Sequence, residues 1–226
     1  MHLAPTLRVL LAGVGVVALL TGCASDAPTT ASTSTPTPTP TPFSKTNPLR
    51  LAVIGDSNTN GFSGTWDTGV ERANAYICYI TDAAIESVGG WANNGASSTY
   101  MAQMVTPIED VDVLAVMIGT NNKQEGVTPE ALVGDIDRAV ATIAPRNVVI
   151  LAIPPMDAAP EIPVSINAQL AGLADKRDWD YFDPWLGLRG SDDKWEPEFL
   201  RDGLHTTRAG YEKMGINLQE HLKDTF

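Results

Sequence analysis

The sequence contains few of the residues from which cysteine-based metal sites, disulfide frameworks and nucleic-acid interfaces are built. It has 2 cysteines and 3 histidines among 226 residues, and its 15 Lys and Arg face 27 Asp and Glu, for a formal net charge of −12 at pH 7. A protein that binds phosphates needs clustered cations to displace counterions, and the sequence has no such cluster. We therefore expect no nucleic-acid partner and no binding to anionic lipid headgroups.

Long hydrophobic runs are also scarce. The longest, VLLAGVGVVALL at 9–20, follows Arg8 and has 12 residues, whereas a membrane span needs about 20. This pattern is typical of an export signal. The signal ends in Leu20-Thr21-Gly22-Cys23, which resembles the lipobox of bacterial lipoproteins.

The lipobox resemblance implies that residues 1–22 are removed and that Cys23 is acylated. The protein would then be exported and anchored by lipid on the outer face of the bacterial cytoplasmic membrane, with the anchor as its only membrane contact. An ordinary signal peptide followed by a chance cysteine is the alternative. If Cys23 carries lipid, Cys78 is alone and cannot form a disulfide framework.

Residues 23–48 are predicted to be a tether. They are rich in Ser, Thr and Pro, with TPTPTPTP at 35–42, and have no periodic apolar pattern. Because proline keeps a chain extended at about 3.1 Å per residue, the tether could reach roughly 75 Å from Cys23. Residues 49–226 then form one folded domain.

Short apolar runs alternate with helical patterns in this domain. LRLAVI (49–54), VDVLAVMI (111–118) and NVVILAI (147–153) are nearly continuous hydrophobic strands, as expected of a parallel sheet covered on both faces. WDYF (179–182) is a weaker strand, and the segment near 88–91 is a doubtful one. We expect a three-layer α/β/α sandwich.

Helices are predicted from caps and apolar spacing. Thr128 and Pro129 begin one helix, which Pro145 ends, and another starts at about Thr207. Residues 73–84 are a third predicted helix, in which Cys78 is read as a small buried hydrophobe. The apolar stripes of the first two helices consist of Leu132, Ile136, Val140 and Ile143, and of Tyr211, Met214, Leu218 and Leu222.

Polar, glycine-containing segments follow the predicted strands at their carboxyl ends, which is the ligand-binding edge of open α/β sheets. They are GDSNTNG, NNGASS, GTNN and DGLH. The first contains Ser57, whose hydroxyl needs a base to become a nucleophile.

The candidate bases are His205 and His221, since His2 leaves with the signal. His221 lies near the end of the last helix, where a solvated helix-end cation is the ordinary explanation. His205 follows Asp202 by three residues, a spacing that lets the carboxylate orient the imidazole. Alternatively, Asp202 and Thr206 are simply helix-start residues and His205 lies on the surface.

When Ser57 is considered together with Asp202 and His205, the sequence resembles the SGNH hydrolases, also called GDSL-type esterases. Four ordered blocks across 49–226 carry the resemblance, which implies a flavodoxin-like five-stranded parallel sheet of order 2-1-3-4-5. The blocks are Gly55-Asp56-Ser57 with Gly61, then Gly95, then Gly119-Thr120-Asn121-Asn122, and finally Asp202-Gly203-Leu204-His205.

The resemblance also implies roles. Ser57 would be the nucleophile, His205 the general base and acid, and Asp202 the residue that orients His205. The backbone N–H groups of Ser57 and Gly95 and the amide of Asn121 would form the oxyanion hole, with no cofactor or metal ion. A turn glycine at Gly95 and a loop cap at Asn121 are the structural alternatives.

One residue departs from the family pattern, because Asn122 stands where the third block usually has aspartate. Because of this departure, the charge and the loop hydrogen bonds near the oxyanion hole cannot be taken over from the family.

The substrate is less well defined by the sequence. About 178 folded residues leave little length for a lid, which favours a short acyl group. Trp66 and Trp195 lie in loops at the site edge, where they would either stack on sugar rings or serve in packing. We expect a serine esterase acting on short-chain acyl esters, O-acetyl above all, of carbohydrate.

The same residues also fit an acyltransferase acting on envelope sugars, a lysophospholipase or a thioesterase. A non-catalytic envelope-binding lipoprotein is the alternative outside enzymes.

Overall fold

Five parallel strands form the sheet in the computed structural model, which describes residues 42–61 and 75–226. The order is β2-β1-β3-β4-β5, as the family resemblance implied. The strands are β1 (Leu49–Gly55), β2 (Ile85–Ala92), β3 (Val113–Met117), β4 (Asn147–Leu151) and β5 (Asp180–Phe182). The doubtful segment near 88–91 is therefore part of a genuine strand.

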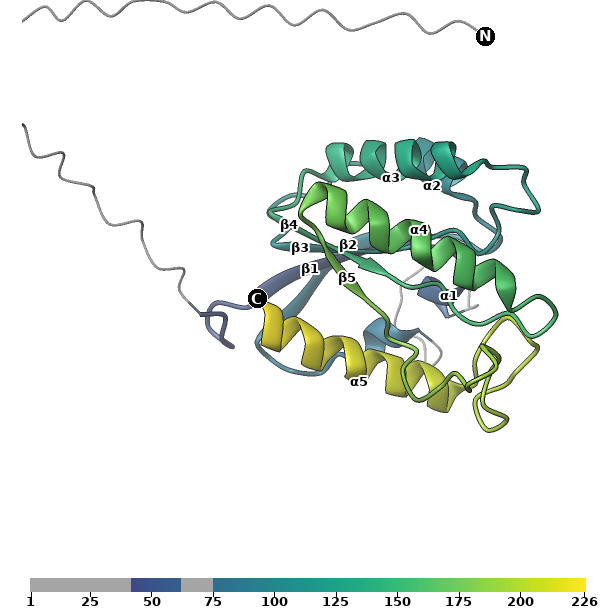
Figure 1. Ribbon diagram of the computed structural model, residues 1–226. Coiled ribbons are helices and arrows are strands. Elements are labelled where there is room, and N and C mark those ends of the chain that lie inside the picture. The colour runs from purple at the N-terminus through teal and green to yellow at the C-terminus, as the bar shows by residue number, and fades with distance from the viewer. Residues whose placement is uncertain (1–41, 62–74) are drawn as a thin grey trace, which may run out of the picture. The chain divides into compact units, whose positions relative to one another are not determined.

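Helices cover both faces of the sheet (Figure 1), which confirms the predicted three-layer sandwich. One face carries α2 (Ser98–Met104), α3 (Pro129–Ile143) and α4 (Glu161–Arg177), and the other carries α5 (Arg208–Thr225). Each face has its own cluster of buried apolar side chains. The central strands β1, β3 and β4 contribute to both clusters, which explains why their sequences lack polar alternation.

The predicted helix ends are confirmed. The Thr128 hydroxyl accepts the backbone N–H of Ala131 at 3.2 Å, and α3 ends where Ala144 adopts the left-handed conformation at φ 52°. Thr207 caps α5 in the same way. The apolar stripe of α5 predicted from the sequence is buried in full.

The predicted helix at 73–84 is wrong for the residues described. Only a 3₁₀ turn, η2 (Tyr76–Tyr79), forms there. The backbone N–H groups of Thr81 and Asp82 both donate to the side-chain oxygen of Gln219 on α5, at 2.7 and 2.8 Å. Hydrogen bonds to a neighbouring helix thus replace those that would have continued this segment as a helix of its own.

Phe43 and Cys78 pack on the cluster of buried apolar side chains that includes those of α5. The prediction that residues 23–48 are all tether is therefore wrong at Phe43, which contacts this cluster, as does the half-buried Cys78 of η2. The packing of Cys78 fits its interpretation as a small hydrophobe. Among the described residues, no helix combines the length and the apolar character needed to cross a membrane.

Candidate active site

The candidate nucleophile lies directly beyond the end of β1. Ser57 opens a single helical turn, α1 (Ser57–Asn60), and Asp56 caps this turn by accepting the Asn58 N–H at 2.9 Å. The turn packs closely on the strand end, because a Cβ at Gly55 would lie 2.1 Å from the Thr59 hydroxyl oxygen. Glycine is therefore required at Gly55, which accounts for the first residue of the block.

Three side chains from opposite ends of the folded chain meet beside this turn. The Ser57 hydroxyl oxygen lies 2.9 Å from Nε2 of His205, across 148 positions of sequence. Nδ1 of His205 lies 3.0 Å from Oδ2 of Asp202. The expected juxtaposition of hydroxyl, imidazole and carboxylate is present.

The Asp202 carboxylate is held by its own loop. Its Oδ1 accepts the backbone N–H groups of Leu204 and His205 at 3.1 and 2.8 Å. Partial burial raises the pKa of Asp202, but these hydrogen bonds and the nearby imidazole outweigh burial, so its pKa lies below the ordinary value. A charged carboxylate at Nδ1 favours the tautomer in which Nδ1 donates and Nε2 accepts from Ser57.

Asp157, in the loop after β4, braces the His205 loop and was not predicted. Its backbone N–H donates to the carbonyl of Gly203 at 2.9 Å, and its carboxylate accepts the backbone N–H of Trp195 at 3.0 Å. The only sequence indication is an acidic residue shortly after a buried strand. Gly203 itself has φ 84°, which glycine adopts without strain.

The two further candidates for an oxyanion hole lie after β2 and β3. Gly95 has φ 74°, and a Cβ there would meet nothing within 4 Å, so the backbone conformation rather than packing requires glycine. Asn121 is buried, and its side-chain nitrogen donates to the carbonyl of Ala96 at 3.0 Å. The Asn121 amide thus lies next to the Gly95-Ala96 segment.

Asn122, the departure from the family pattern, makes specific bonds. Its Oδ1 accepts the Ser98 N–H at 2.9 Å, and its Nδ2 lies 3.0 Å from the Ser98 hydroxyl oxygen. The same hydroxyl donates to Oδ2 of Asp135 on α3 at 2.9 Å. Spacing along the chain gave no indication of this network, because its members come from three separate segments.

Asp56 is a second carboxyl group at the site that was not predicted as functional. It has 0% exposure, and burial raises its pKa to about 6, against the hydrogen bond from the backbone N–H of Asn58, the nearby Thr120 side chain and attraction to His205, which lower it. A carboxyl group that shares the neighbourhood of the imidazole and titrates near neutral pH is a common feature of active sites.

The remaining sequence candidates lie elsewhere. His221 is paired with Asp180 and stacked on Phe182 with ring centroids 4.0 Å apart, so it is bound to β5 rather than free in solvent. Trp195 is 5% exposed and packs edge to face on Trp185, which makes it a packing residue. Trp66 and Cys23 lie outside the described residues.

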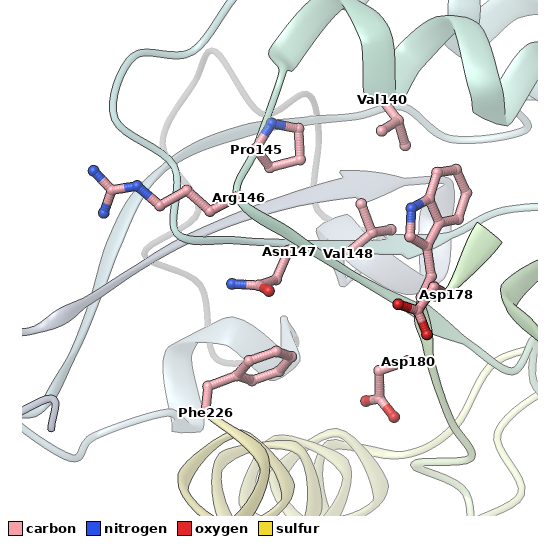
Figure 2. A pocket seen from close by; sticks show the side chains of 9 residues that line it. Val140, Pro145, Arg146, Asn147, Val148, Asp178, Asp180 and Phe226 are labelled. Atoms are coloured by element: carbon pink, nitrogen blue, oxygen red, sulfur yellow. The ribbon is translucent and has the colours of Figure 1, made fainter. Parts of the chain in front are cut away.

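Two of the cavities in the described part of the chain lie at opposite ends of the strands. Figure 2 shows one of about 360 Å³ where Asn147 and Asp180 begin β4 and β5, which is the edge opposite to Ser57. Another, of about 320 Å³, is lined by Asn122 and Lys123 and by apolar side chains that include Leu132 and Ile166. Only the second cavity adjoins the segment that carries Asn121.

Comparison with solved structures identifies the fold. A protein assigned to the lipolytic G-D-S-L family from Desulfitobacterium hafniense DCB-2 matches with a TM-score of 0.62 at 16% identity, over 76% of this chain and 98% of its own. A carbohydrate acetylesterase family member from Sinorhizobium meliloti matches with a TM-score of 0.58 at 18% identity, over 77% and 97%.

The native aryl esterase of M. smegmatis matches with a TM-score of 0.58 at 16% identity, over 78% of this chain and 99% of its own. At these identities the likeness shows a shared fold. A comparison with curated proteins found no match.

The sequence places the protein within one family of this fold. The chain belongs to the GDSL-like lipase/acylhydrolase family, whose model matches residues 53–213. It is accordingly a carboxylic ester hydrolase, and the family implies a small-molecule ester substrate. The matched range contains the Ser57 block and the His205 block.

Proposed function

We propose that this protein is a serine esterase that removes short acyl groups, O-acetyl groups above all, from carbohydrate. The observation that carries the proposal is the 2.9 Å contact between the Ser57 hydroxyl oxygen and Nε2 of His205, with Asp202 at the opposite ring nitrogen. Such an arrangement turns a weak nucleophile into a reactive one.

The proposed reaction has two halves. The Ser57 oxygen attacks the ester carbonyl carbon while Nε2 of His205 accepts the hydroxyl proton, and the proton then passes to the departing sugar alkoxide. This leaves an acyl group on Ser57 and a free sugar hydroxyl. Water, deprotonated by His205, attacks the acyl carbon and releases the carboxylic acid, and Ser57 regains its proton.

The oxyanion of each tetrahedral intermediate would be stabilised by the backbone N–H groups of Ser57 and Gly95 and by the Asn121 amide. An amide nitrogen carries two hydrogens, and the bond from Asn121 to Ala96 uses one of them. This bond fixes the side chain, and the second hydrogen is available to the substrate. A donor fixed before the reaction needs no reorganisation as charge develops.

One comparison supports the choice of substrate. The cavity of about 320 Å³ beside Asn122 does not, because neither Ser57 nor His205 is among the residues that line it. The similar structure from Sinorhizobium meliloti is described as a carbohydrate acetylesterase family member. Trp195 is buried, so it does not offer a surface on which a sugar ring could stack.

The test is a panel of p-nitrophenyl acetate, butyrate and octanoate together with O-acetylated xylan, assayed with wild type, Ser57→Ala and the control Ser191→Ala. Ser191 is exposed, and its removal should leave the rates unchanged. Ser57→Ala should lose most of its turnover, by up to about 10⁶ in kcat. Acetate should be hydrolysed faster than octanoate.

Substantial turnover by Ser57→Ala would refute the assignment of Ser57 as the nucleophile. Hydrolysis of octanoate as fast as acetate would refute the proposed preference for short acyl groups. Accumulation of acylated sugar, when a carbohydrate acceptor is added, would instead identify an acyltransferase.

We further propose that the enzyme is exported and anchored through an acylated Cys23. The lipobox-like sequence supports this proposal. Because Phe43 packs on the folded domain, the proposed tether ends before it, and residues 23–41 at about 3.1 Å each would let the esterase reach esters within roughly 60 Å of the membrane surface.

A further inference from the structure

A buried chain of hydrogen bonds runs from Asn122 through Ser98 to Asp135, and all three residues are at most 4% exposed. The Asn122 amide lies 3.0 Å from the Ser98 hydroxyl oxygen, and this hydroxyl lies 2.9 Å from Asp135. The Asp135 carboxylate is held in place by a second hydroxyl, from Thr99 at 2.7 Å, and by Arg138 at 3.5 Å.

The direction of each bond in this chain is determined by the residue types. A carboxylate only accepts, so Ser98 must give its single hydroxyl hydrogen to Asp135. The Ser98 oxygen then has only lone pairs for Asn122, and only the amide nitrogen of Asn122 can donate to them. An aspartate at 122 would set two acceptors against each other and bring a second buried negative charge near Asp135.

The same residues hold the two loops of the proposed oxyanion hole together. The backbone N–H of Ser98 donates to Oδ1 of Asn122, and the side chain of Asn121 donates to the carbonyl of Ala96. Gly95 is exposed, and a Cβ added there would meet no atom within 4 Å. Its N–H is therefore positioned by the bonds of its neighbours, which are these two and the turn bond from the Ala96 N–H to the carbonyl of Asn93 at 3.2 Å.

We propose that Asn122 and Asp135 are a matched pair of positioning residues joined through Ser98. Together they keep the Gly95 N–H and the Asn121 amide aligned to donate to the oxyanion. The inference rests on the hole assigned under the proposed function. It explains why asparagine stands where the family pattern has aspartate, since Asp135 already supplies the negative charge and Ser98 needs a donor.

The decisive experiment exchanges the hydrogen-bond donor at position 122 and the acceptor at position 135. In Asn122→Asp, Ser98 faces two acceptors, and we expect kcat to fall about 10- to 100-fold, since small misplacements at a site cost up to about 10². In Asn122→Asp/Asp135→Asn, Ser98 donates to the acid at 122 and accepts from the amide at 135, so kcat should recover at least about 10-fold over Asn122→Asp. KM should change by less than about 3-fold throughout, because the hole acts on the transition state.

Asn217→Asp is the matched control. Asn217 also donates its side-chain amide to a backbone carbonyl, that of Pro184 at 3.0 Å, but it lies on α5 away from Ser98. This variant should lose stability without losing kcat. Should Asn122→Asp fail to fold, Ser98→Ala provides the same information, because it removes both bonds through the hydroxyl and should lower kcat with little change in KM.

Urea unfolding gives a second readout that needs no substrate. It compares wild type, Asn122→Asp, Asp135→Asn and the double variant. The double variant should be more stable than the two single changes predict when added. Absence of this coupling, or a double variant no faster than Asn122→Asp, would overturn the pairing. Absence of esterase activity in wild type would overturn the proposed function, while the coupling in unfolding would still be measured.

Discussion

Replacing Asp56 with asparagine should stabilise the protein at neutral pH although the residue caps the turn that carries Ser57. The Asp56 carboxyl group is completely buried, and its pKa is about 6 in the folded protein against 3.8 for a model carboxyl group. A raised pKa means that the folded state binds the proton more tightly than the unfolded state. The stabilisation from protonated Asp56 is therefore fully present below pH 3.8 and is lost as the pH rises through 6.

The size of this effect follows from the shift. A rise from 3.8 to about 6 is roughly two pKa units, and one unit corresponds to about 1.4 kcal/mol, which gives on the order of 3 kcal/mol at pH 7. Asparagine keeps an oxygen for the Asn58 N–H and carries no charge at any of these pH values. Because pH 4 already lies slightly above 3.8, the stability of Asp56→Asn relative to wild type should increase by about 2.5 kcal/mol between pH 4 and pH 7.

The assay is urea unfolding followed by tryptophan fluorescence at pH 4, 5, 6 and 7. Asp175→Asn is the control, because Asp175 is an exposed carboxyl group on α4 and its replacement removes the same charge at the surface. The relative stability of the control should be nearly independent of pH. If the gain from Asp56→Asn were the same at pH 4 and pH 7, the assignment of a costly buried charge to Asp56 would be wrong.

Two further predictions concern the oxyanion hole and the anchor. Asn121→Ala should lower kcat by about 10² to 10³ with little change in KM, measured with p-nitrophenyl acetate; a loss confined to KM would remove Asn121 from the hole. Cys23→Ser, expressed from the full chain in a bacterium with lipoprotein processing, should move the protein from the membrane fraction to the soluble fraction, and equal membrane retention of variant and wild type would refute lipid anchoring.

The sheet could be predicted because its central strands are buried on both faces. Leu51, Val53 and Ile54 of β1 have 0% exposure, and a strand in that position shows a continuous apolar sequence that can hardly be mistaken. Strand β2 was doubtful for the converse reason, since it is an edge strand with exposed residues and two adjacent glycines. The caps of α3 and α5 were predictable because a single hydroxyl before each helix determines where it begins.

Tertiary partners decided the features that the sequence did not reveal. The chain after Tyr79 is not helical because Gln219, over 130 residues away, binds its backbone N–H groups. Trp195 lies in a polar loop but is buried against Trp185. His221 is paired with Asp180 across 41 positions. None of these contacts leaves a local pattern in the sequence, since each depends on how distant elements pack.

The meeting of Ser57 and His205 was inferable for a different reason. Parallel strands bring all their carboxyl ends to one edge, so polar residues after β1 and in the chain beyond β5 are brought together by topology alone. Topology does not, however, determine the orientation of a side chain to within a fraction of an ångström. In this structure the bonds from Asp202 and Asp157 fix the His205 loop, and the bonds through Ser98 tie the loops of the proposed hole.

The site therefore contains more buried polar groups than its fold requires. All four residues of α1 are polar and buried, and Asp56 beneath them has an oxygen without a hydrogen-bond partner among the described residues. Each such group costs free energy that an apolar residue would not. A hydroxyl held at the end of a central strand can be kept in one position only by polar neighbours that are themselves fixed. The stability gain expected from Asp56→Asn measures part of that cost.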